Sequence, residues 1–591
     1  MTAPLSFPHA TIVVVGPGIV GMPMAALLAD AARRLDASPG EVVVIQRNSP
    51  TSGWKVAAIN RGKCPIGGVE PNLDRLIAVN AAAGTLRASH SYDEVQKADV
   101  ILVCVQTDKK GAGPDYGPLY EALHGIASAL AASPVHRRPL LIIESTLAPS
   151  SMQSVVRPLF EGYGLIEGQH ILLGNSPNRV MPGRLVERVA SADKIVGALR
   201  PATASRIAEL YGRIVTGGRL LQTSSLTAEV VKTLENAYRD VRIAFAAELV
   251  RWCDASDVDF FALRERMNDS LERRDTASHD GTAVPSGAVL VPTVGVGGHC
   301  LPKDGILLWW RAVEGGLPSD QSLILGARDI NDAAPAVTLR IARTLGAPIQ
   351  HQRVTVLGAA YRPDSEDTRN SPSLQLALQL KTAGAEVTVH DPYVRAHDAN
   401  LRTLKLASHF TNSLEAALSS AEVVFVGAGH AVYRDLPSRW PSLAPLAGMV
   451  VDGANLYAAS HFATLGVRYG GVGRGTTAPS DRLVESALNQ FRAVERGIAN
   501  EVAELAEFLN SHYADSVFNE VLFEDVQALA RTCATGCDIV DRGDVALKAD
   551  DTGFASRLAR RAAARWGSPM GASPTPTRDQ RRSSAQRAPA A

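Results

Sequence analysis

A short run of glycines near the N-terminus constrains the fold more than any other feature of the sequence. Gly16, Gly18 and Gly21 form a G-x-G-x-x-G pattern directly after an apolar, β-branched run, Thr11–Val15, and before a helix-like stretch. Glycines at these spacings allow a tight turn, the close approach of a pyrophosphate to backbone N–H groups, and close packing of the helix on the strand. The pattern therefore predicts a dinucleotide-binding turn at the edge of a parallel sheet.

Short apolar runs alternate with helix-length stretches in two separate parts of the chain. The first part contains strand-like runs at Thr11–Val15, Glu41–Ile45, Val100–Val105, Leu140–Glu144 and His170–Leu173, and the second at Arg353–Leu357, Glu386–His390, Glu422–Val426 and Met449–Val451. Such alternation is typical of a parallel sheet with helices on both faces. We therefore predict an α/β protein with two doubly wound, Rossmann-like domains, one at residues 9–200 and a smaller one at 350–475.

The part between these domains, residues 202–335, has a helical pattern. Its longest uninterrupted stretch, Ser225–Ala255, carries apolar residues at every third or fourth position: Val230, Leu234, Ala237, Val241, Phe245 and Leu249. This spacing places them on one face of a long helix. We predict a central helical domain whose long helix buries this apolar stripe in a homodimer or a higher homo-oligomer.

Two segments follow the second domain. Residues 480–566 carry Leu483, Ala487, Phe491, Val494 and Ile498 at helical spacing, which predicts a helical extension whose role the sequence does not define. Residues 567–591 are rich in Pro, Ser, Ala and Arg, and they have too little apolar surface to offset the entropy lost on ordering. This tail is therefore predicted to be disordered.

Charge and cysteine content exclude several classes of function. The chain has 60 Lys+Arg and 60 Asp+Glu residues, so nothing favours nucleic acid or an anionic membrane as a partner. Its apolar runs are much shorter than the roughly 20 residues of a membrane span, and its N-terminus has no signal-peptide pattern. Cys533 and Cys537 lie four apart on an expected helix without a nearby histidine, so no metal site is expected. We predict a cytoplasmic protein with free thiols.

The residues after the second strand bear on the choice of cofactor. A carboxylate at this place binds the adenosine ribose in many dinucleotide sites. Here Gln46 and Arg47 follow the strand instead. Gln46 can hydrogen-bond a hydroxyl without repelling a 2′-phosphate, whereas Arg47 can attract that phosphate, stack on adenine or point to solvent. NAD is the predicted cofactor, and NADP remains open.

A glycine-dense loop, residues 295–304, carries the clearest chemical signal. It reads Gly-Val-Gly-Gly-His-Cys-Leu-Pro-Lys-Asp and delivers Cys300 to the start of a predicted helix, where Pro302 suits the first turn. The N–H groups of a helix N-terminus and the charge of Lys303 favour a thiolate, which is the reactive form of cysteine. Asp304 can act as a base or position one. The loop therefore predicts a nucleophilic cysteine.

This loop resembles the active-site loop of the UDP-glucose, UDP-N-acetylmannosamine and GDP-mannose dehydrogenases. Further resemblances follow in order along residues 10–475. They comprise Lys55-Val56, Asn60-Arg61-Gly62, Pro65-Ile66-Gly67, Glu144-Ser145-Thr146, the substrate loop 176–183, Ala228–Lys232 with Asn236, Ala327–Asp332, Pro363–Ser373 and Asp391-Pro392-Tyr393. Residues beyond about 480 match nothing in the family. The chain is identified as a member of the nucleotide-sugar dehydrogenases.

The resemblance implies that the C6 alcohol of a sugar nucleotide is oxidised to a carboxylate in two NAD-dependent steps. Cys300 captures the aldehyde as a thiohemiacetal, which a second oxidation turns into a thioester. Lys232 and Asp304 serve the first oxidation, and Lys232 and Asn236, one helical turn apart, share an oxyanion. Water near Thr146 and Asp304 hydrolyses the thioester.

The resemblance also implies residues for the two ligands. The cofactor residues are Gly16, Gly18, Ile19, Val20, Gly21, Gln46, Arg47, Thr107, Thr146, Lys303 and Arg369, and the substrate residues are Asn178, Arg179, Lys232, Asn236, Gly297 and Arg362. Arg179 binds the sugar or a phosphate, or forms a structural ion pair. Arg362 stands where many members have lysine, and either cation can hold a diphosphate. The expected substrate is a UDP-sugar, either UDP-glucose or a UDP-N-acetylhexosamine.

Asn178 departs from the family pattern, which commonly has a glutamate with a proposed acid/base role in the substrate loop. An amide cannot accept a proton, so Asp304 acts as the base alone, Glu144 or another carboxylate substitutes, or thioester hydrolysis is slow. Asn178 and Gln46 also support a second hypothesis, in which the chain is a catalytically truncated or non-catalytic relative that binds a sugar nucleotide. The presence of Cys300 with its expected partners argues against it.

Overall fold

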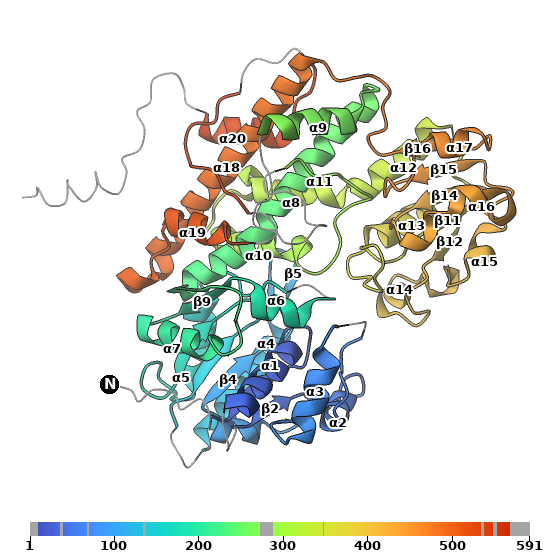
Figure 1. Cartoon of the computed structure of the whole chain (residues 1–591). Coiled ribbons are helices and arrows are strands. Elements are labelled where there is room, and N and C mark those ends of the chain that lie inside the picture. Colours follow the sequence, from blue (N-terminus) through green and yellow to red (C-terminus); the bar gives the residue numbers. More distant parts are fainter. Residues whose placement is uncertain are drawn as a thin grey trace, which may run out of the picture.

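Two largely parallel sheets each lie beside a bundle of helices in the computed structural model of the chain, the N-terminal sheet below the bundle and the second sheet to its right in Figure 1. The structure describes residues 10–35, 40–67, 70–133, 137–180, 183–271, 288–346, 348–533, 537–547 and 552–567. The tail predicted to be disordered lies, apart from Gly567, outside these residues. The α/β class with two Rossmann-like domains, a helical central part and a helical C-terminal extension is confirmed.

The N-terminal sheet has eight strands in the order β10-β9-β8-β7-β4-β1-β2-β3, and only β8 and β9 pair antiparallel. Its strands are β1 (Ile12–Val15), β2 (Val42–Ile45), β3 (Leu86–Ser89), β4 (Val100–Val103), β7 (Leu140–Ile143), β8 (Leu172–Asn175), β9 (Lys194–Ala198) and β10 (Leu220–Ser224). Successive side chains of β1 enter different cores, Ile12 on one face of the sheet and Val13 on the other. Both faces are therefore buried, as a parallel sheet requires.

Helices cover both faces of this sheet. They are α1 (Gly21–Leu35), α2 (Trp54–Asn60), α3 (Leu73–Ala82), α4 (Gly117–Ala131), α5 (Arg157–Gly162), α6 (Leu185–Ser191) and α7 (Pro201–Tyr211). A small hairpin, β5 (Asp108–Lys110) and β6 (Gly113–Asp115), follows β4. It packs against the helix Leu301–Glu314, which begins directly after Cys300, and so links the sheet to the cysteine loop.

The second sheet has six parallel strands in the order β13-β12-β11-β14-β15-β16. They are β11 (Arg353–Leu357), β12 (Glu386–His390), β13 (Phe410–Thr411), β14 (Val423–Val426), β15 (Met449–Asp452) and β16 (Arg468–Gly471). Its helices are α12 (Ala334–Thr344), α13 (Pro372–Thr382), α14 (Ala399–Thr403), α15 (Leu414–Leu418), α16 (Leu436–Leu443) and α17 (Ser460–Ala463). The strand order reverses between β11 and β14, where ligands bind in open α/β sheets.

The central helices and the C-terminal extension share one hydrophobic core. The central helices are α8 (Ser225–Ala255), α9 (Phe260–Leu271), α10 (Leu301–Glu314) and α11 (Leu323–Asp332), and the extension contributes α18 (Asp481–Tyr513), α19 (Phe523–Ala530) and α20 (Arg557–Trp566). Figure 1 shows the extension, in orange and red, beside α8, α9 and α11.

The long helix begins and ends at the predicted residues, but its apolar stripe is covered within the chain. Val230, Leu234, Ala237, Val241, Phe245 and Leu249 all have no exposed surface, because α10, α11 and the extension pack around α8. The prediction that a second copy buries this stripe is wrong, since the extension was not expected to fold back onto α8.

Several local predictions also need correction. Strands β3, β9, β10, β13 and β16 were not predicted, and most of them are short or carry polar residues. Within the predicted helical extension, residues 537–547 form no helix. Since α19 ends at Ala530, Cys533 and Cys537 are both buried and neither lies in a helix. Among the described residues, no helix is both long and apolar enough to cross a membrane.

Candidate active site

The glycine turn after β1 has the geometry of a pyrophosphate cradle. Gly16 has φ +98°, and a Cβ there would lie 2.7 Å from the carbonyl oxygen of Cys104. A Cβ on Gly21 would lie 2.1 Å from the Gly16 oxygen, so both positions exclude any side chain. A Cβ on Gly18 would meet nothing within 4 Å, which leaves its backbone open to a ligand. Ile19 and Val20 lead into the N-terminus of α1, whose N–H groups favour phosphate.

The two residues after β2 differ in how they are held. Gln46 is half-buried and its Nε2 donates to Ser52 Oγ at 2.9 Å. Arg47 is exposed and pairs with Glu121 at 3.0 Å, with more than half of each side chain open to solvent. An exposed pair of this kind is weak and easily exchanged. Gln46 is therefore the more firmly placed group for a ribose hydroxyl.

The cysteine loop docks on the N-terminal sheet at the carboxyl ends of β4 and β7. Thr107 Oγ1 donates to the carbonyl of Thr146 at 2.8 Å, which ties these two strand ends together. The ring of His299 lies 2.9 Å through Nε2 from the carbonyl of Thr107. Burial and the nearby Lys303 charge lower the pKa of His299. Cys300 thus lies next to the edge where a bound dinucleotide would place its nicotinamide.

Four of the predicted catalytic residues come together at the start of α10. Asp304 is fully buried and accepts from Asn236 Nδ2 at 2.6 Å and from Lys303 Nζ at 2.7 Å. Lys232, one turn before Asn236 on α8, donates to the backbone carbonyl of Asn178 at 2.9 Å. Cys300 is exposed and precedes the first residue of α10. The structure therefore unites residues that are more than 60 positions apart in the chain.

The thiol of Cys300 does not have the lowered pKa that its position suggested. The dense protein around it and the carboxylate of Asp304 raise the pKa, while Lys232, Lys303 and Arg369 act in the opposite direction. The expectation of a thiolate favoured by the helix N-terminus and Lys303 is thus incomplete. Lys303 directs its ammonium at Asp304, which neutralises much of the charge that would otherwise stabilise the thiolate.

Asn178 belongs to a buried polar network behind the substrate loop. Its Nδ2 donates to Glu144, and its Oδ1 accepts from Lys194 Nζ at 3.1 Å. Glu144 also pairs with Lys194 at 2.9 Å and accepts from the hydroxyl of Tyr211. Burial lowers the pKa of Lys194 and raises that of Tyr211. The amide fixes the loop, and Glu144 has its carboxylate engaged by three donors.

Lys194 and Tyr211 were not predicted as part of the site. No local pattern marks them, because each reaches Glu144 only in the folded sheet, where β8 separates β9 from β7 and α7 packs on β7. Glu144 could be foreseen, since it ends a strand within a motif. Its partners depend on tertiary contacts 50 and 67 positions away.

Arg179 forms a structural ion pair. Its guanidinium donates to Glu235, and both side chains are almost completely buried. It also donates to Thr532 Oγ1 at 2.8 Å and to the carbonyl of Leu529 at 3.1 Å, both in the C-terminal extension. Of the two roles considered for Arg179, the structural one is therefore the one that the geometry favours.

The second domain reaches the cysteine loop through its segment 361–372. The N–H of Gly298 donates to the carbonyl of Arg369 at 2.8 Å, and a Cβ on Gly297 would lie 2.4 Å from that of Tyr361. The Arg369 guanidinium pairs with Asp367 at 2.6 Å, which raises its pKa. Arg362 is exposed near this contact. Arg369 thus lies close enough to Cys300 for its charge to act on the thiol.

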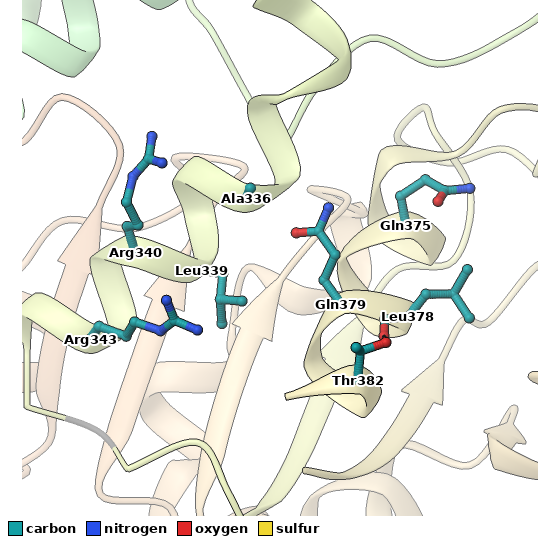
Figure 2. A pocket seen from close by; sticks show the side chains of 8 residues that line it. All are labelled: Ala336, Leu339, Arg340, Arg343, Gln375, Leu378, Gln379 and Thr382. Atoms are coloured by element: carbon teal, nitrogen blue, oxygen red, sulfur yellow. The ribbon is translucent and has the colours of Figure 1, made fainter. Parts of the chain in front are cut away.

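A shallow pocket of about 380 Å³ lies elsewhere on the second domain. It runs between α12 and α13 and is lined by Ala336, Leu339, Arg340, Arg343, Gln375, Leu378, Gln379 and Thr382 (Figure 2). Its two arginines are exposed, and none of its lining residues belongs to the predicted site. The pocket is therefore separate from the chemistry around Cys300.

Comparison with known proteins agrees with this arrangement. Models of the UDP-glucose/GDP-mannose dehydrogenase family match the chain with their NAD binding domain over residues 10–215, their central domain over 226–333 and their UDP binding domain over 355–459. The UDP-N-acetyl-D-mannosamine dehydrogenase of Pyrococcus horikoshii is 31% identical over 471 residues, which is 78% of this chain and 99% of the relative.

Two further relatives are similar over most of their length. The NDP-N-acetyl-D-galactosaminuronic acid dehydrogenase of Ralstonia nicotianae is 31% identical over 437 residues, or 72% of this chain and 92% of the relative. The solved structure of the enzyme of that name from Methanosarcina mazei Go1 has a TM-score of 0.66 at 31% identity, over 79% of this chain and 96% of its own. This chain therefore belongs to the UDP-glucose/GDP-mannose dehydrogenase family and is an NAD-dependent oxidoreductase that acts on a CH–OH group.

Proposed function

We propose that this chain oxidises the C6 alcohol of a UDP-sugar to a carboxylate in two steps, with Cys300 as the nucleophile. The observation that supports this most is the arrangement at the start of α10. There the exposed thiol of Cys300 lies beside Asp304, whose carboxylate is held between Asn236 and Lys303. A structural cysteine would be buried in an apolar core and would need no such partners.

The first oxidation removes a proton and a hydride from the alcohol. The turn from Gly16 to Gly21 would hold the pyrophosphate of NAD, which when bound would supply the hydride acceptor for each oxidation. Asp304 takes the alcohol proton, directly or through a water molecule, and Lys232 stabilises the alkoxide. Lys232 suits this role because its contact with the carbonyl of Asn178 holds the ammonium at the substrate loop.

Capture by the thiol prevents loss of the aldehyde. The thiol of Cys300 gives its proton to water as its sulfur forms a bond to the aldehyde carbon, and the resulting oxyanion is stabilised by Lys232 and Asn236. Loss of a second hydride converts the thiohemiacetal to a thioester. Water near Thr146 then attacks the thioester, which releases the carboxylate and regenerates the thiol, so each sugar reduces two cofactors.

We propose Asp304 as the base for the hydrolytic step as well. Asn178 cannot accept a proton, and Glu144 is buried and engaged by Lys194, Tyr211 and Asn178. Glu144 would have to give up these bonds to activate water. Because Asn236 and Lys303 hold the Asp304 carboxylate, we expect hydrolysis to be the slow step of the cycle.

The names of the relatives support an N-acetylhexosamine as the sugar. The Pyrococcus horikoshii relative is a UDP-N-acetyl-D-mannosamine dehydrogenase, and the Ralstonia relative also has an N-acetylated hexosamine derivative in its name. We propose that residues 9–200 bind NAD, that 202–335 supply the catalytic residues, and that 350–475 bind the UDP moiety. Arg362 and Arg369 of this last domain, with the backbone at Gly297, would face the sugar nucleotide and the cofactor.

The direct experiment compares UDP-N-acetylmannosamine, UDP-N-acetylgalactosamine, UDP-N-acetylglucosamine and UDP-glucose, each with NAD. The proposal expects two NADH per sugar consumed and a carboxylate product with the preferred N-acetylhexosamine. The lack of a proton acceptor at Asn178 is the observation that supports the non-catalytic alternative. Tight binding of the sugar nucleotide without NADH formation would favour that alternative.

A further inference from the structure

The C-terminal extension covers a face of α8 that the rest of the chain leaves open. The family models end at residue 459, and 78% of this chain accounts for 99% of the Pyrococcus horikoshii relative, so the extension is an addition to the family fold. Phe245 of α8 contacts Phe491 of α18 and Phe554, with ring centroids 5.3 and 6.1 Å apart. Without residues 480–567, this apolar face would be exposed to water and would require another partner.

The sequence of α18 repeats that of α8. The pattern N-x-aromatic-R-x-V occurs once in each helix and is followed at the same spacing by Ala and Glu. In α8 the residues are Asn236, Tyr238, Arg239, Val241, Ala246 and Glu248, and in α18 they are Asn489, Phe491, Arg492, Val494, Ala499 and Glu501. Both helices have a serine N-cap, Ser224 or Ser480, although the two caps differ by three positions in this register. The two helices thus correspond residue by residue over several turns.

Glu248 of α8 and Glu501 of α18, which correspond in the repeat, each accept hydrogen bonds from the start of a helix in the other half of the bundle. Glu248 of α8 accepts from the hydroxyl of Ser556 at 2.8 Å and from the N–H groups of Arg557 and Leu558, at the start of α20. Glu501 of α18 accepts from the hydroxyl of Ser322 and from the N–H groups of Leu323 and Ile324, at the start of α11. Each long helix therefore caps a helix that packs on the other.

The crossing of α8 and α18 shows the same reciprocity. The hydroxyl of Tyr238 lies 3.2 Å from Glu495, and the guanidinium carbon of Arg242 lies 5.9 Å from the ring centroid of Phe491. Tyr238 corresponds to Phe491 in the repeat, and Arg242 corresponds to Glu495. The short helices follow the same rule, because α9 packs on α18 and α19 packs on α8. These reciprocal contacts are those that a pseudo-twofold axis between α8 and α18 would produce.

We propose that residues 480–567 are a degenerate second copy of the central helices, fused in cis, which serves as a built-in partner for α8 and completes the substrate loop. The copy has Glu485 where α8 has Lys232, so it binds the first copy and does not form a second active site. The contacts between α8 and α18 resemble those of a symmetric dimer interface, but both helices belong to one chain. The occupant of the α8 face is thus the chain's own extension and not a second molecule.

The copy reaches the substrate loop through the C-terminal end of α19. The carbonyl oxygens of Leu529 and Thr532, with Thr532 Oγ1, surround the guanidinium of Arg179. Carbonyls at a helix C-terminus attract a cation. Since Arg179 adjoins Asn178, whose carbonyl accepts from Lys232, the extension positions the loop that carries the proposed substrate contacts. Thr532 is a positioning residue in this account.

Isotope-mixed cross-linking tests the cis arrangement independently of any activity. Arg157 of α5 pairs with Asp515 of the extension at 2.5 Å, and Arg266 of α9 pairs with Asp481. The full-length variants Arg157→Lys and Arg266→Lys would each be mixed as light and ¹⁵N-labelled protein, joined with a zero-length carbodiimide, and digested. We expect Lys–Asp linkages in which both peptides are light or both are heavy. Linkages between light and heavy peptides, or the absence of both linkages, would overturn the proposal.

A second experiment tests the substrate-loop contact and rests on the proposed function. Thr532→Val removes the hydroxyl that Arg179 contacts, whereas Thr532→Ser keeps it. We expect the KM for the UDP-sugar to rise roughly tenfold in the valine variant, as for loss of one hydrogen bond to a charged group, with kcat changed by less than about twofold. The serine variant should match the wild type. An unchanged KM in the valine variant, or equal impairment in both variants, would overturn the positioning role.

Discussion

Glu501 provides a stability test that can be worked out from the structure. Its carboxyl is fully buried in α18, where it accepts from the hydroxyl of Ser322 and from the N–H groups of Leu323 and Ile324. Burial raises the pKa of this carboxyl from 4.5 to about 7, although these donors act in the opposite direction. Glu501→Gln keeps the size of the side chain and removes its titration.

The pH dependence has a definite sign. Because the folded chain holds the proton of Glu501 more tightly than the unfolded chain, this group contributes stability that is fully present below pH 4.5 and is lost as the pH rises through 7. A rise from 4.5 to about 7 corresponds to roughly 3 kcal/mol at 1.36 kcal/mol per pKa unit. The free energy of unfolding of Glu501→Gln, relative to the wild type, should therefore increase by about 3 kcal/mol between pH 4 and pH 8.

Urea denaturation at several pH values, followed by circular dichroism, measures this difference. Gln also loses part of the cap on α11, which adds a cost that does not vary with pH. Glu507→Gln, which removes an exposed carboxylate of the same helix, serves as the matched control and should give a nearly constant difference. A Glu501→Gln difference that stays flat or falls with rising pH would refute the assignment of a raised pKa to this contact.

Three further outcomes are expected. Since the pKa of Cys300 is raised above 9, alkylation of the free enzyme by iodoacetamide should be slow at pH 7 and should accelerate above pH 9; a rate already maximal at pH 7 would contradict this. Gln46→Asp should weaken any use of NADP by repelling the 2′-phosphate, and an unchanged ratio of NAD to NADP activity would show that another group reads the ribose. A general base contributes about 10²–10⁴-fold to its step, and the proposed base Asp304 is held by Asn236 and Lys303. Stopped-flow mixing should therefore show a burst of about two NADH per active site before slow turnover, and linear progress from the first turnover would show that hydrolysis is not the slow step.

The sequence allowed the parts of the fold with local patterns to be predicted. The glycine turn at Gly16 and the bounds of the Ser225–Ala255 helix were predicted correctly, because both depend on residues adjacent in the chain or one turn apart. Short strands with polar residues, such as Lys194–Ala198, were missed because their only signal is the pairing that they make in the sheet.

The candidate site could be predicted in its residues but not in its contacts. Cys300, Asp304, Lys232 and Asn236 were identified together from their motifs. The structure places Asn236 in direct contact with Asp304, whereas Lys232, one turn earlier on α8, contacts the substrate loop. The pairing of Lys194 with Glu144 could not be foreseen, because nothing in a single strand indicates which neighbour its lysine will meet.

The role of the C-terminal extension was also beyond local reasoning. Its helical pattern was recognised, but the repeat of the α8 pattern in α18 becomes meaningful only when Glu248 and Glu501 are seen to cap opposite helices. The same limit explains the wrong partner predicted for the α8 stripe. A periodic apolar face shows that something must cover it and does not show what.

Covalent capture of the sugar by Cys300 is the central claim, and mass spectrometry of the quenched enzyme tests it most directly. The wild-type protein, mixed with NAD and UDP-N-acetylmannosamine and stopped with acid within the first turnovers, should carry the mass of the oxidised sugar nucleotide on the peptide that contains Cys300. Cys300→Ser should carry no adduct and should form no carboxylate, because a serine alkoxide is much harder to generate at neutral pH than a thiolate. Full carboxylate formation by Cys300→Ser would contradict the account.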